Sequence, residues 1–474
     1  MKITEIYIKN FKAFCGPYHI DLHKAGKNLL VYGENGSGKS SLYLALKLFL
    51  ESGVDMNSTG NKDPDFGSHR NIFTEDPGHI KVCLRAHQGS KMDTYEWSQR
   101  VKETDDELIV EASKAKGFLD YKDLLETHYL HREHKVVNVF GLLVNNLLAN
   151  TISDQTERSL TEDWNDIQPP FPRRGATTQI AALEGRVVNF NRELANRLTE
   201  LQTKASEILR KFGYNVTLDL NFQGIRYNSD DKTLDNQEIL LTVEFFDRDI
   251  PEHHRFLNEA KVSAIAIAIY FSSILLQPTS TLKILALDDV LIGLDMSNRL
   301  PVLDILDEYF SNHQIFLTTY DKAWYEIVKQ RTSHGGKWKA VEFYFRQTDE
   351  YEIPVYAENK TYLDKAKEYL DANDYKACAI YLRTAFEITI EEFCEAEGLQ
   401  IRYHRDRNKL NSQDFWQAIN DQRPNLLTPS LIRDIELYRS RILNPLSHTT
   451  ITNIPKKEIE DAIEAVERLK MALQ

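Results

Sequence analysis

Apolar and polar residues follow patterns that predict strands over much of the first 350 residues. Residues 3–8 and 18–22 alternate apolar with polar side chains, as expected of strands with one buried face. The apolar run at 29–32, and that at 282–287 with Lys283 as its one polar residue, suit strands that are buried on both faces. Residues 41–50, in contrast, indicate a helix. Alternation of such elements predicts an α/β protein with a mixed sheet.

A long helix is predicted from about Thr178 to Phe212. Its apolar residues recur at intervals of three and four over about five heptads, and at 1.5 Å per residue it would be ~50 Å long. These residues are Ile180, Leu183, Val187, Phe190, Leu194, Leu198, Leu201, Ala205, Ile208 and Phe212. A polar stretch with three prolines, residues 151–177, precedes the helix and indicates a linker. Two arrangements stay open: the helix lies on its own domain, or it is an arm that pairs between subunits.

Beyond residue 352 the pattern changes. From Asn359 onward nearly the whole sequence has helical spacing, which predicts a small all-α bundle. The expected helices are 360–372, 374–397, 412–420, 429–444 and 456–473. We therefore divide the chain into residues 1–150, 151–213, 214–352 and 353–474. The first and third parts form one α/β domain, the second is the linker and inserted helical arm, and the fourth is the all-α C-terminal domain.

The composition is that of a soluble globular protein, with 42% hydrophobic and 27% charged residues among 474. The net charge of −13 argues against a protein that coats nucleic acid with its whole surface. The longest largely apolar run, Ser263–Leu276, is too short to cross a bilayer, and the N-terminus lacks the features of a signal peptide. Four scattered cysteines, Cys15, Cys83, Cys378 and Cys394, fit buried reduced thiols. We therefore expect a cytoplasmic protein without a membrane partner.

A glycine-rich loop between the strand at 29–32 and the following helix carries the clearest chemistry. Its residues, Gly33, Glu34, Asn35, Gly36, Ser37, Gly38, Lys39 and Ser40, fit G-x-x-x-x-G-K-[ST] without a mismatch, and Ser41 completes the expected nucleotide-binding set. The glycines allow positive-φ turns and a close approach of the backbone to phosphate oxygens. Lys39 is expected to reach the β- and γ-phosphates, as a catalytic residue, and the Ser40 hydroxyl to ligate Mg²⁺. The expected cofactors are ATP and Mg²⁺.

Further motifs follow in a fixed order. Asn258 stands in Leu-Asn-Glu-Ala-Lys, ahead of an alanine-rich helix, and Asp288 and Asp289 end the buried strand at 282–287. Asp295 ends Gly-Leu-Asp, and Tyr320 follows the next strand. In this order the motifs resemble those of the SMC/RecF-type ABC ATPases: signature, Walker B, D-loop and the residue after the next strand. That family also begins with I-x-x-x-x-I-x-N-F and a further strand ahead of the phosphate loop.

The resemblance implies a role for each of these residues. Asp288 would hold the hydration shell of Mg²⁺, and Asp289 would replace the glutamate that usually activates water. Asn258 and Asp295 would act in trans, on the nucleotide of another subunit. Tyr320 stands where most relatives have a histidine that senses the γ-phosphate. Because aspartate is shorter than glutamate and a phenol does not titrate as an imidazole does, we expect slow hydrolysis at an intersubunit site.

Two more positions depend on the same resemblance. The family has a basic residue near the nucleotide beside the N-F pair, which indicates Lys12; a solvated turn lysine is the alternative. The family also has a glutamine that contacts Mg²⁺ and water, but no glutamine lies between Gln99 and Gln155. His128 and His131 are the substitutes in this interval, and ordinary surface or core histidines are the alternative.

Among ABC ATPases of this size, the chain is most similar to those of bacterial anti-phage defence, above all the AriA family of PARIS ATPase subunits. The size, the short arm and the helical C-terminal domain carry this resemblance. It implies a homo-oligomer of dimer units, up to a hexameric ring, that holds a TOPRIM-type nuclease inactive. A phage trigger protein, such as a DNA mimic, would then release the nuclease to cut tRNA in an abortive infection.

Two other functions stay open. Arg441 and His448 loosely resemble the R-x(4–6)-H motif of HEPN ribonucleases, which would make the chain a self-contained ATPase and anticodon nuclease. A RecF-like DNA-repair ATPase is the other alternative, and the net charge of −13 disfavours it. The basic, partly aromatic segment 402–409 fits contact with nucleic acid, an acidic partner, or a solvated connection. The sequence leaves nucleic-acid binding by this chain undecided.

Overall fold

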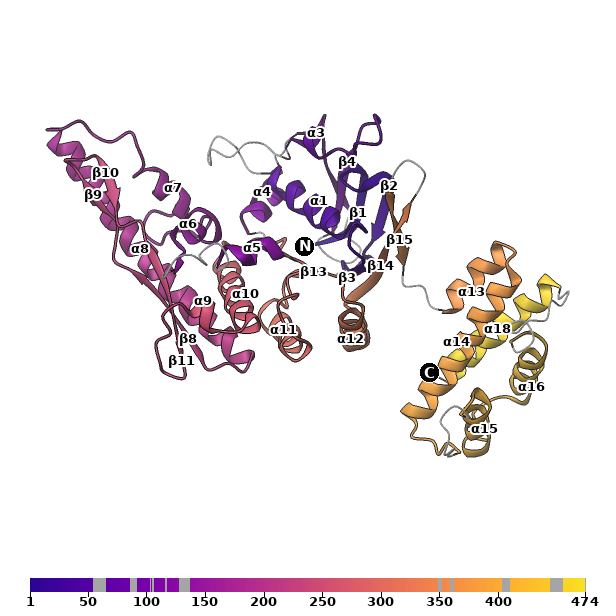
Figure 1. Cartoon of the computed structure of the whole chain (residues 1–474). Coiled ribbons are helices and arrows are strands. Elements are labelled where there is room, and N and C mark those ends of the chain that lie inside the picture. The colour runs from indigo at the N-terminus through magenta and orange to yellow at the C-terminus, as the bar shows by residue number, and fades with distance from the viewer. Residues whose placement is uncertain are drawn as a thin grey trace. The chain divides into compact units, whose positions relative to one another are not determined.

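The computed structural model describes most of the chain as two compact units, Met1–Ala357 and Glu358–Gln474 (Figure 1). The described residues are 1–53, 65–85, 92–102, 104, 106–115, 117–127, 137–347, 352–358, 362–402, 410–443 and 455–473. The first unit is α/β with several sheets, and the second is helical. The expected α/β class with an all-α C-terminal part is confirmed.

A six-stranded sheet is the centre of the first unit, with the strand order β15-β14-β3-β13-β12-β6. A four-stranded sheet has the order β2-β1-β4-β5, a three-stranded sheet the order β7-β11-β8, and β10 pairs with β9. The strands are β1 (Lys2–Phe11), β2 (Phe14–Asp21), β3 (Asn28–Gly33), β4 (His79–Arg85), β5 (Asp93–Ser98), β6 (Gly117–Asp120), β7 (Val137–Asn138), β8 (Val216–Phe222), β9 (Arg226–Asn228), β10 (Thr233–Asp235), β11 (Ile239–Phe245), β12 (Ile284–Asp288), β13 (Gln314–Thr319), β14 (Trp338–Gln347) and β15 (Glu352–Glu358).

The central sheet is buried on both faces, as its continuous apolar runs predict. In β3, Leu29 and Val31 face one core, whereas Leu30 and Tyr32 face the other. β12 divides its side chains between the same two cores. Strands β14, β3, β13, β12 and β6 are parallel neighbours. Their carboxyl ends therefore meet along one edge of the sheet, which is where α/β proteins place ligands.

Helices cover this sheet. Those of the first unit are α1 (Lys39–Glu51), α3 (Phe66–His69), α4 (Glu107–Lys114), α5 (Tyr121–Glu126), α6 (Phe140–Leu142), α7 (Leu160–Asn165), α8 (Thr177–Lys211), α9 (His253–Phe256), α10 (Glu259–Leu275), α11 (Met296–Tyr309) and α12 (Lys322–Thr332). A π-helical turn, Leu143–Leu147, follows α6. Helix α10 is buried on all sides from Val262 to Ile274, which explains its lack of a polar face.

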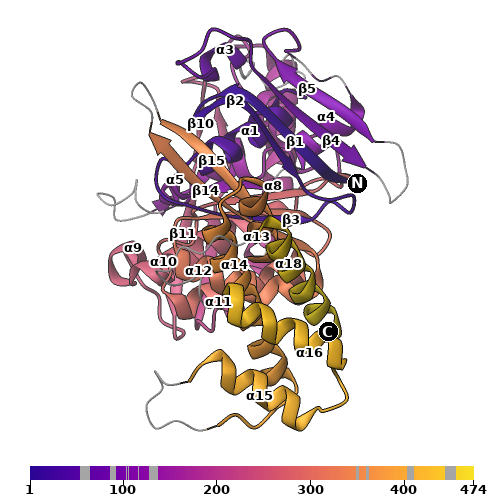
Figure 2. The ribbon, with the colours of Figure 1, turned by 90° about the vertical axis from the view of Figure 1, so that its right-hand side faces the viewer.

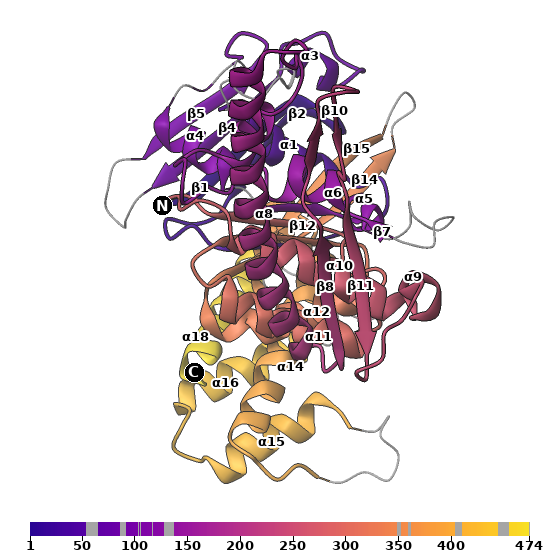
Figure 3. The same cartoon turned by 90° about the vertical axis from the view of Figure 1, so that its left-hand side faces the viewer.

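The long helix α8 lies on its own domain. It packs against α10, α7, β8 and β9, and Figure 3 shows it running beside β8 and β11. Apart from Ile180, the apolar residues predicted to form its buried seam, such as Leu194 and Leu201, are buried within the first unit. The first of the two arrangements left open by the sequence therefore holds within this chain.

The stretch 151–177, expected to be a linker, contains helix α7. Ser159 and Glu162 form a capping box at its start, and Trp164 packs against Phe140 and Phe190. The prolines dominated the sequence interpretation, although S-x-x-E ahead of an apolar run is a recognised helix-start signal. The stretch predicted as a linker therefore contains a short helix that the sequence interpretation did not anticipate.

The second unit is a bundle of helices around its own core (Figure 2). Its helices are α13 (Tyr362–Asp371), α14 (Tyr375–Ala396), α15 (Ser412–Gln422), α16 (Pro429–Tyr438) and α18 (Lys456–Ala472). A π-helical turn, Arg439–Leu443, continues α16. Arg441 is exposed there, whereas His448 and residues 403–409 lie outside the described residues.

Candidate phosphate site at the carboxyl edge of the central sheet

The glycine-rich loop joins β3 to α1 at this edge. Gly36 and Gly38 have φ angles of 86° and 95°, a conformation that favours glycine. A Cβ at Gly33 would lie 2.2 Å from Ser37 Oγ, so a larger residue would collide with the loop itself. The sequence therefore uses glycine where the loop requires it, and the loop leads directly into the first turn of a 13-residue helix.

Lys39 is folded back into the loop. Its side chain is only 4% exposed, and Nζ donates hydrogen bonds to the carbonyls of Gly33 at 2.7 Å and Glu34 at 3.2 Å. Nζ also lies 3.5 Å from Asp289 Oδ2. The loop lysine and the second Walker B carboxylate, far apart in sequence, are thus in contact.

The loop also contains a buried hydroxyl without a partner. Ser37 is fully buried, and its Oγ has no hydrogen-bond partner among the described residues. Such a group is costly unless a ligand or water satisfies it. Ser40, in contrast, is exposed at the start of α1, and Ser41 Oγ accepts a hydrogen bond from Ala13 N at 3.3 Å.

Asp288 ends β12 and is 6% exposed. Thr318 Oγ1 donates a hydrogen bond to its Oδ1 at 2.5 Å. One oxygen therefore has a fixed partner, which orients the carboxylate. The described residues contain no group of three or more His, Cys, Asp or Glu side chains arranged to hold a metal. The single Asp288 carboxylate at this position fits Mg²⁺, which is usually held by one or two carboxylates together with substrate phosphates.

Asp289 adopts a left-handed backbone conformation, with φ at 53°. Aspartate tolerates this conformation better than most residues, which gives a local reason for aspartate at this position. The Tyr320 N–H donates to Asp289 Oδ1 at 2.9 Å. Burial raises the pKa of Asp289; the Asp288 charge raises it further, whereas Lys39 and the Tyr320 N–H lower it. The result is a carboxylate that is more basic than an exposed aspartate, as general-base chemistry needs.

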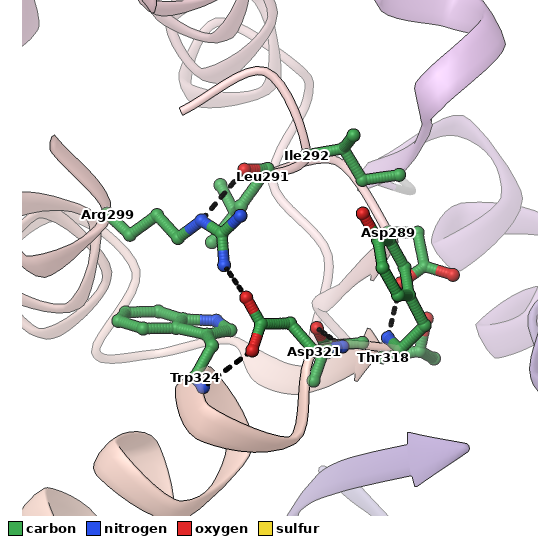
Figure 4. Close-up of a pocket in the computed structure, with 9 residues that line it drawn as sticks. Asp289, Leu291, Ile292, Arg299, Thr318, Asp321 and Trp324 are labelled. Carbon is green, nitrogen blue, oxygen red and sulfur yellow. Dashed lines mark hydrogen bonds and ion pairs between the residues drawn. The ribbon is translucent and has the colours of Figure 1, made fainter. Parts of the chain in front are cut away.

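Tyr320 contributes its backbone at this site. Its side chain is exposed, and it lines a small pocket with Asp289, Leu291 and Arg299 (Figure 4). Asp321 follows it and caps α12, accepting a hydrogen bond from Trp324 N at 3.1 Å. The structure therefore brings Tyr320 to the site, and the role of its phenol stays a prediction.

Asn258 and Asp295 occupy equivalent places on two other helices. Asn258 caps α10, accepting from Lys261 N at 3.1 Å. Asp295 caps α11 and accepts from Asn298 N and Ser297 Oγ at 3.1 and 2.7 Å. These bonds, with that from Ser297 foremost, lower the pKa of Asp295. Both residues are exposed, and their described side-chain bonds go to their own helices instead of the phosphate loop.

Lys12 lies on an exposed turn with φ at 48°. The turn is fixed by hydrogen bonds from Lys12 N to His69 O and from Asn71 Nδ2 to Lys12 O, at 2.8 and 2.7 Å. The next residue, Ala13, bonds to Ser41 in α1. The backbone of Lys12 is therefore held close to the first turn of α1.

Asp120 lies beside the site and was missed by the sequence interpretation; its carboxylate caps α5, accepting from Lys122 N at 2.8 Å and Asp123 N at 2.9 Å. It ends β6 and pairs with Asp288 in the parallel ladder, so two carboxylates stand side by side at the sheet edge. The buried Tyr43 phenol in α1 has no hydrogen-bond partner among the described residues, and burial, then Asp123, Asp120 and Asp288, raise its pKa. The missed signal is Gly-Phe-Leu-Asp, a short apolar run that ends in a carboxylate. His128 and His131, the expected substitutes for the family's glutamine, lie outside the described residues.

Comparison with known proteins gives one family. Residues 2–334 match the family described as RecF/RecN/SMC N terminal domain. No curated protein matches the chain. In the described parts of the chain, no helix combines the length and the apolar character that crossing a membrane requires.

Several solved structures show similarity at low identity. An SMC head bound to the C-winged helix domain of ScpA is 12% identical, with a TM-score of 0.42, and the match covers 77% of this chain and 100% of that one. An Smc head with an extended coiled coil, bound to the C-terminal domain of ScpA from Pyrococcus furiosus, is 13% identical with a TM-score of 0.40, covering 79% and 99%. The SMC head domain from Thermotoga maritima is 12% identical with a TM-score of 0.36, covering 76% and 100%.

Proposed function

The chain belongs to the RecF/RecN/SMC N-terminal domain family of ABC-type ATPases, and on this premise we propose that it binds ATP and hydrolyses it slowly at the phosphate loop. The observation that carries the proposal is the contact between Lys39 and Asp289, 3.5 Å apart at the edge of the central sheet. It places the expected phosphate-binding cation beside the expected base.

Each residue then has a defined task. The loop backbone and Lys39 bind the phosphates, and Ser40 and Asp288 would hold Mg²⁺. That ion, when bound, neutralises charge on the phosphate oxygens. Asp289 orients the attacking water and takes its proton, with its own position fixed by the Tyr320 N–H. In this proposal the Lys39 ammonium turns from the carbonyls of Gly33 and Glu34 toward a phosphate, so nucleotide binding reorients this side chain.

We also propose that the working site lies between two subunits. Asn258 and Asp295 are exposed at the starts of α10 and α11. A helix start presents N–H donors and a positive dipole end to an anion. These two residues are therefore suited to a nucleotide held by another copy of the chain. Dimer units, up to a hexameric ring, would be the active form.

At the level of the cell, we propose a scaffold and sensor in anti-phage defence, of the AriA type in PARIS systems. In this role the chain holds a TOPRIM-type nuclease and releases it when a phage trigger protein, such as a DNA mimic, is sensed. Support comes from the sequence resemblance, from the separate helical unit with its own core, and from the net charge of −13, which suits protein partners.

The test uses the full chain, alone and co-expressed with a TOPRIM-type nuclease of a PARIS system. We expect the chain alone to hydrolyse ATP and leave tRNA intact, the nuclease to co-purify, and a DNA-mimic phage protein to start tRNA cleavage. Lys39→Ala should prevent that release, whereas Lys47→Ala, on the same helix, should not.

Two results would contradict the defence-scaffold proposal. Cleavage of tRNA by the chain alone, lost in Arg441→Ala and His448→Ala, would make it a self-contained ATPase and HEPN nuclease. Tight DNA binding that weakens steeply with salt would support a RecF-like repair ATPase.

A further inference from the structure

The pocket beside Asp289 is built around a buried arginine that has no assigned role in the site (Figure 4). Arg299 lies in the first turns of α11, and its side chain is 11% exposed. Its Nε donates to the carbonyls of Leu291 at 3.0 Å and Leu294 at 2.8 Å. One guanidinium therefore holds two carbonyls of the loop that follows the Walker B carboxylates.

The same guanidinium forms an ion pair across the pocket. Arg299 Nη1 lies 2.5 Å from Asp321 Oδ2. Asp321 is the first residue after Tyr320, whose N–H donates to Asp289. Figure 4 shows Asp321 between Arg299 and Asp289. The carboxylate that Arg299 binds therefore belongs to the residue next to Tyr320, whose N–H positions the proposed base.

The loop held by Arg299 also rests on α10. A Cβ at Gly293 would lie 2.3 Å from Ser263 Oγ, so the loop and that helix are in close contact. Ser263 is one turn after the N-terminal end of α10, which Asn258 caps. The loop 291–295 therefore contacts α10, and Arg299 connects that loop to the support of Asp289.

We propose that Arg299 is a positioning residue for Asp289, which fixes the loop 291–295 against the Tyr320–Asp321 segment. In this role it acts through Asp321 and Tyr320, without contacting the nucleotide or the attacking water itself. The planar guanidinium fork serves this task because it reaches two carbonyls and a carboxylate at once, which a lysine ammonium on a flexible stem does not reproduce. The inference rests on the proposed ATP hydrolysis at this site.

Two conservative substitutions isolate this role. Arg299→Lys keeps the charge and loses the forked geometry. Asp321→Asn removes the charge and keeps an oxygen to accept from Trp324 N, so α12 stays capped. We expect either variant to lower kcat about 10- to 100-fold, as small displacements of a catalytic group do. The affinity for a slowly hydrolysed ATP analogue should change less than about twofold, because none of the described hydrogen bonds of Arg299 reaches the loop Gly33–Ser40.

The chain provides a matched control pair on the same two helices. Asp304 in α11 and Arg331 in α12 form an ion pair at 2.5 Å, with side chains 59% and 45% exposed. Arg331→Lys and Asp304→Asn make the same chemical changes away from Asp289. Both controls should keep kcat within about twofold of wild type, as exposed pairs contribute little.

Turnover, analogue binding and thermal unfolding of the full chain decide the matter together. Loss of kcat with retained binding, and a double variant no slower than the worse single variant, would support the proposal. Wild-type kcat in Arg299→Lys would overturn it, and so would a parallel loss of kcat, binding and Tm, which indicates a structural role only. A wild-type chain that binds the analogue but never hydrolyses ATP would overturn the proposed hydrolysis, and the Arg299 proposal with it. When the wild-type chain does hydrolyse ATP, the control pair shows whether a loss of kcat is specific to Arg299 and Asp321.

Discussion

The two parts of the nucleotide machinery differ in how their polar groups are satisfied. Around the phosphate loop, Lys39 and Asp288 are buried, and with Asp289 they make bonds within the first unit. At the starts of α10 and α11, Asn258 and Asp295 are exposed and bond to their own helices. We infer that one chain builds the phosphate-loop half completely and offers the second half to another subunit. Substitutions in the two halves should therefore fail in different ways.

Lys39→Ala should have the largest effect. It removes the cation expected at the β- and γ-phosphates and leaves Asp289 buried without its counter-charge. We expect ATP affinity to fall at least about 100-fold, since a buried charge pair to a ligand is worth several kcal/mol. Titration with a fluorescent ATP analogue measures it. Lys47→Ala, on the same helix, should bind like wild type, and wild-type affinity in Lys39→Ala would refute the phosphate-loop assignment.

Asp289→Asn comes next and separates binding from turnover within the same half. Asparagine keeps an oxygen for the Tyr320 N–H and loses the proton acceptor. We expect kcat to fall about 100- to 1,000-fold, the usual contribution of a general base. ATP should bind as well as to wild type or more tightly, because Lys39 no longer pairs with a carboxylate. Asp304→Asn, which changes an exposed side chain of α11, is the control. Unchanged turnover in Asp289→Asn would place the base elsewhere.

The sequence was sufficient for the parts of the site that depend on local geometry. The glycine loop is defined by neighbours within eight residues, and the buried runs at β3 and β12 require strands that are covered on both faces. Asp288 and Asp289 follow directly from the end of such a strand. For these residues, the local pattern already specifies the position in the fold.

Residues that meet only through the order of strands could not be found in this way. Asp120 reaches the site because β6 pairs with β12, and a search for glutamine in that interval does not detect it. Arg299 matters through contacts with Leu294 and Asp321, on two different segments. Strand β15 was not expected, yet Pro354 packs against the loop: a Cβ at Gly38 would lie 2.8 Å from its Cγ. Tertiary neighbours of this kind need the topology first.

A mixing experiment tests whether the two halves belong to different chains. Lys39→Ala and Asn258→Ala should each be inactive alone, the first for lack of a phosphate cation and the second for lack of a partner-facing side chain. In a one-to-one mixture, random pairing gives half mixed dimers, each with one intact composite site. We expect about a quarter of wild-type turnover per subunit, by simple statistics of a shared site between two subunits. A mixture of Lys39→Ala and Asp304→Asn is the control for dissociation and reassembly, with one active partner. If this control behaves as expected and the Lys39→Ala and Asn258→Ala mixture recovers no turnover, the site lies within one chain.

The pH dependence of turnover gives the smallest effect and tests the environment of Asp289. Burial raises the pKa of this carboxyl most strongly, Asp288 adds to the rise, and Lys39 and the Tyr320 N–H oppose it. The base is therefore lost as pH falls through a value above that of an exposed aspartate. We therefore expect turnover to fall on the acid side only, with a midpoint at higher pH than an exposed aspartate would give.

The position of this acid limb should also depend on the nucleotide. Lys39 lowers the pKa of Asp289 in the ligand-free chain, and it turns toward the phosphates when ATP binds. If Lys39 moves away in this proposed way, the pKa of Asp289 should rise, so the acid limb of kcat lies at higher pH than that of kcat/KM, since the first reports the complex and the second the free protein. Steady-state profiles measure both, with the residual rate of Asp289→Asn as the control that shows no such limb. Coincident limbs would mean that Lys39 keeps its 3.5 Å contact with Asp289 throughout the cycle. The pKa of Asp289 would then not depend on bound nucleotide.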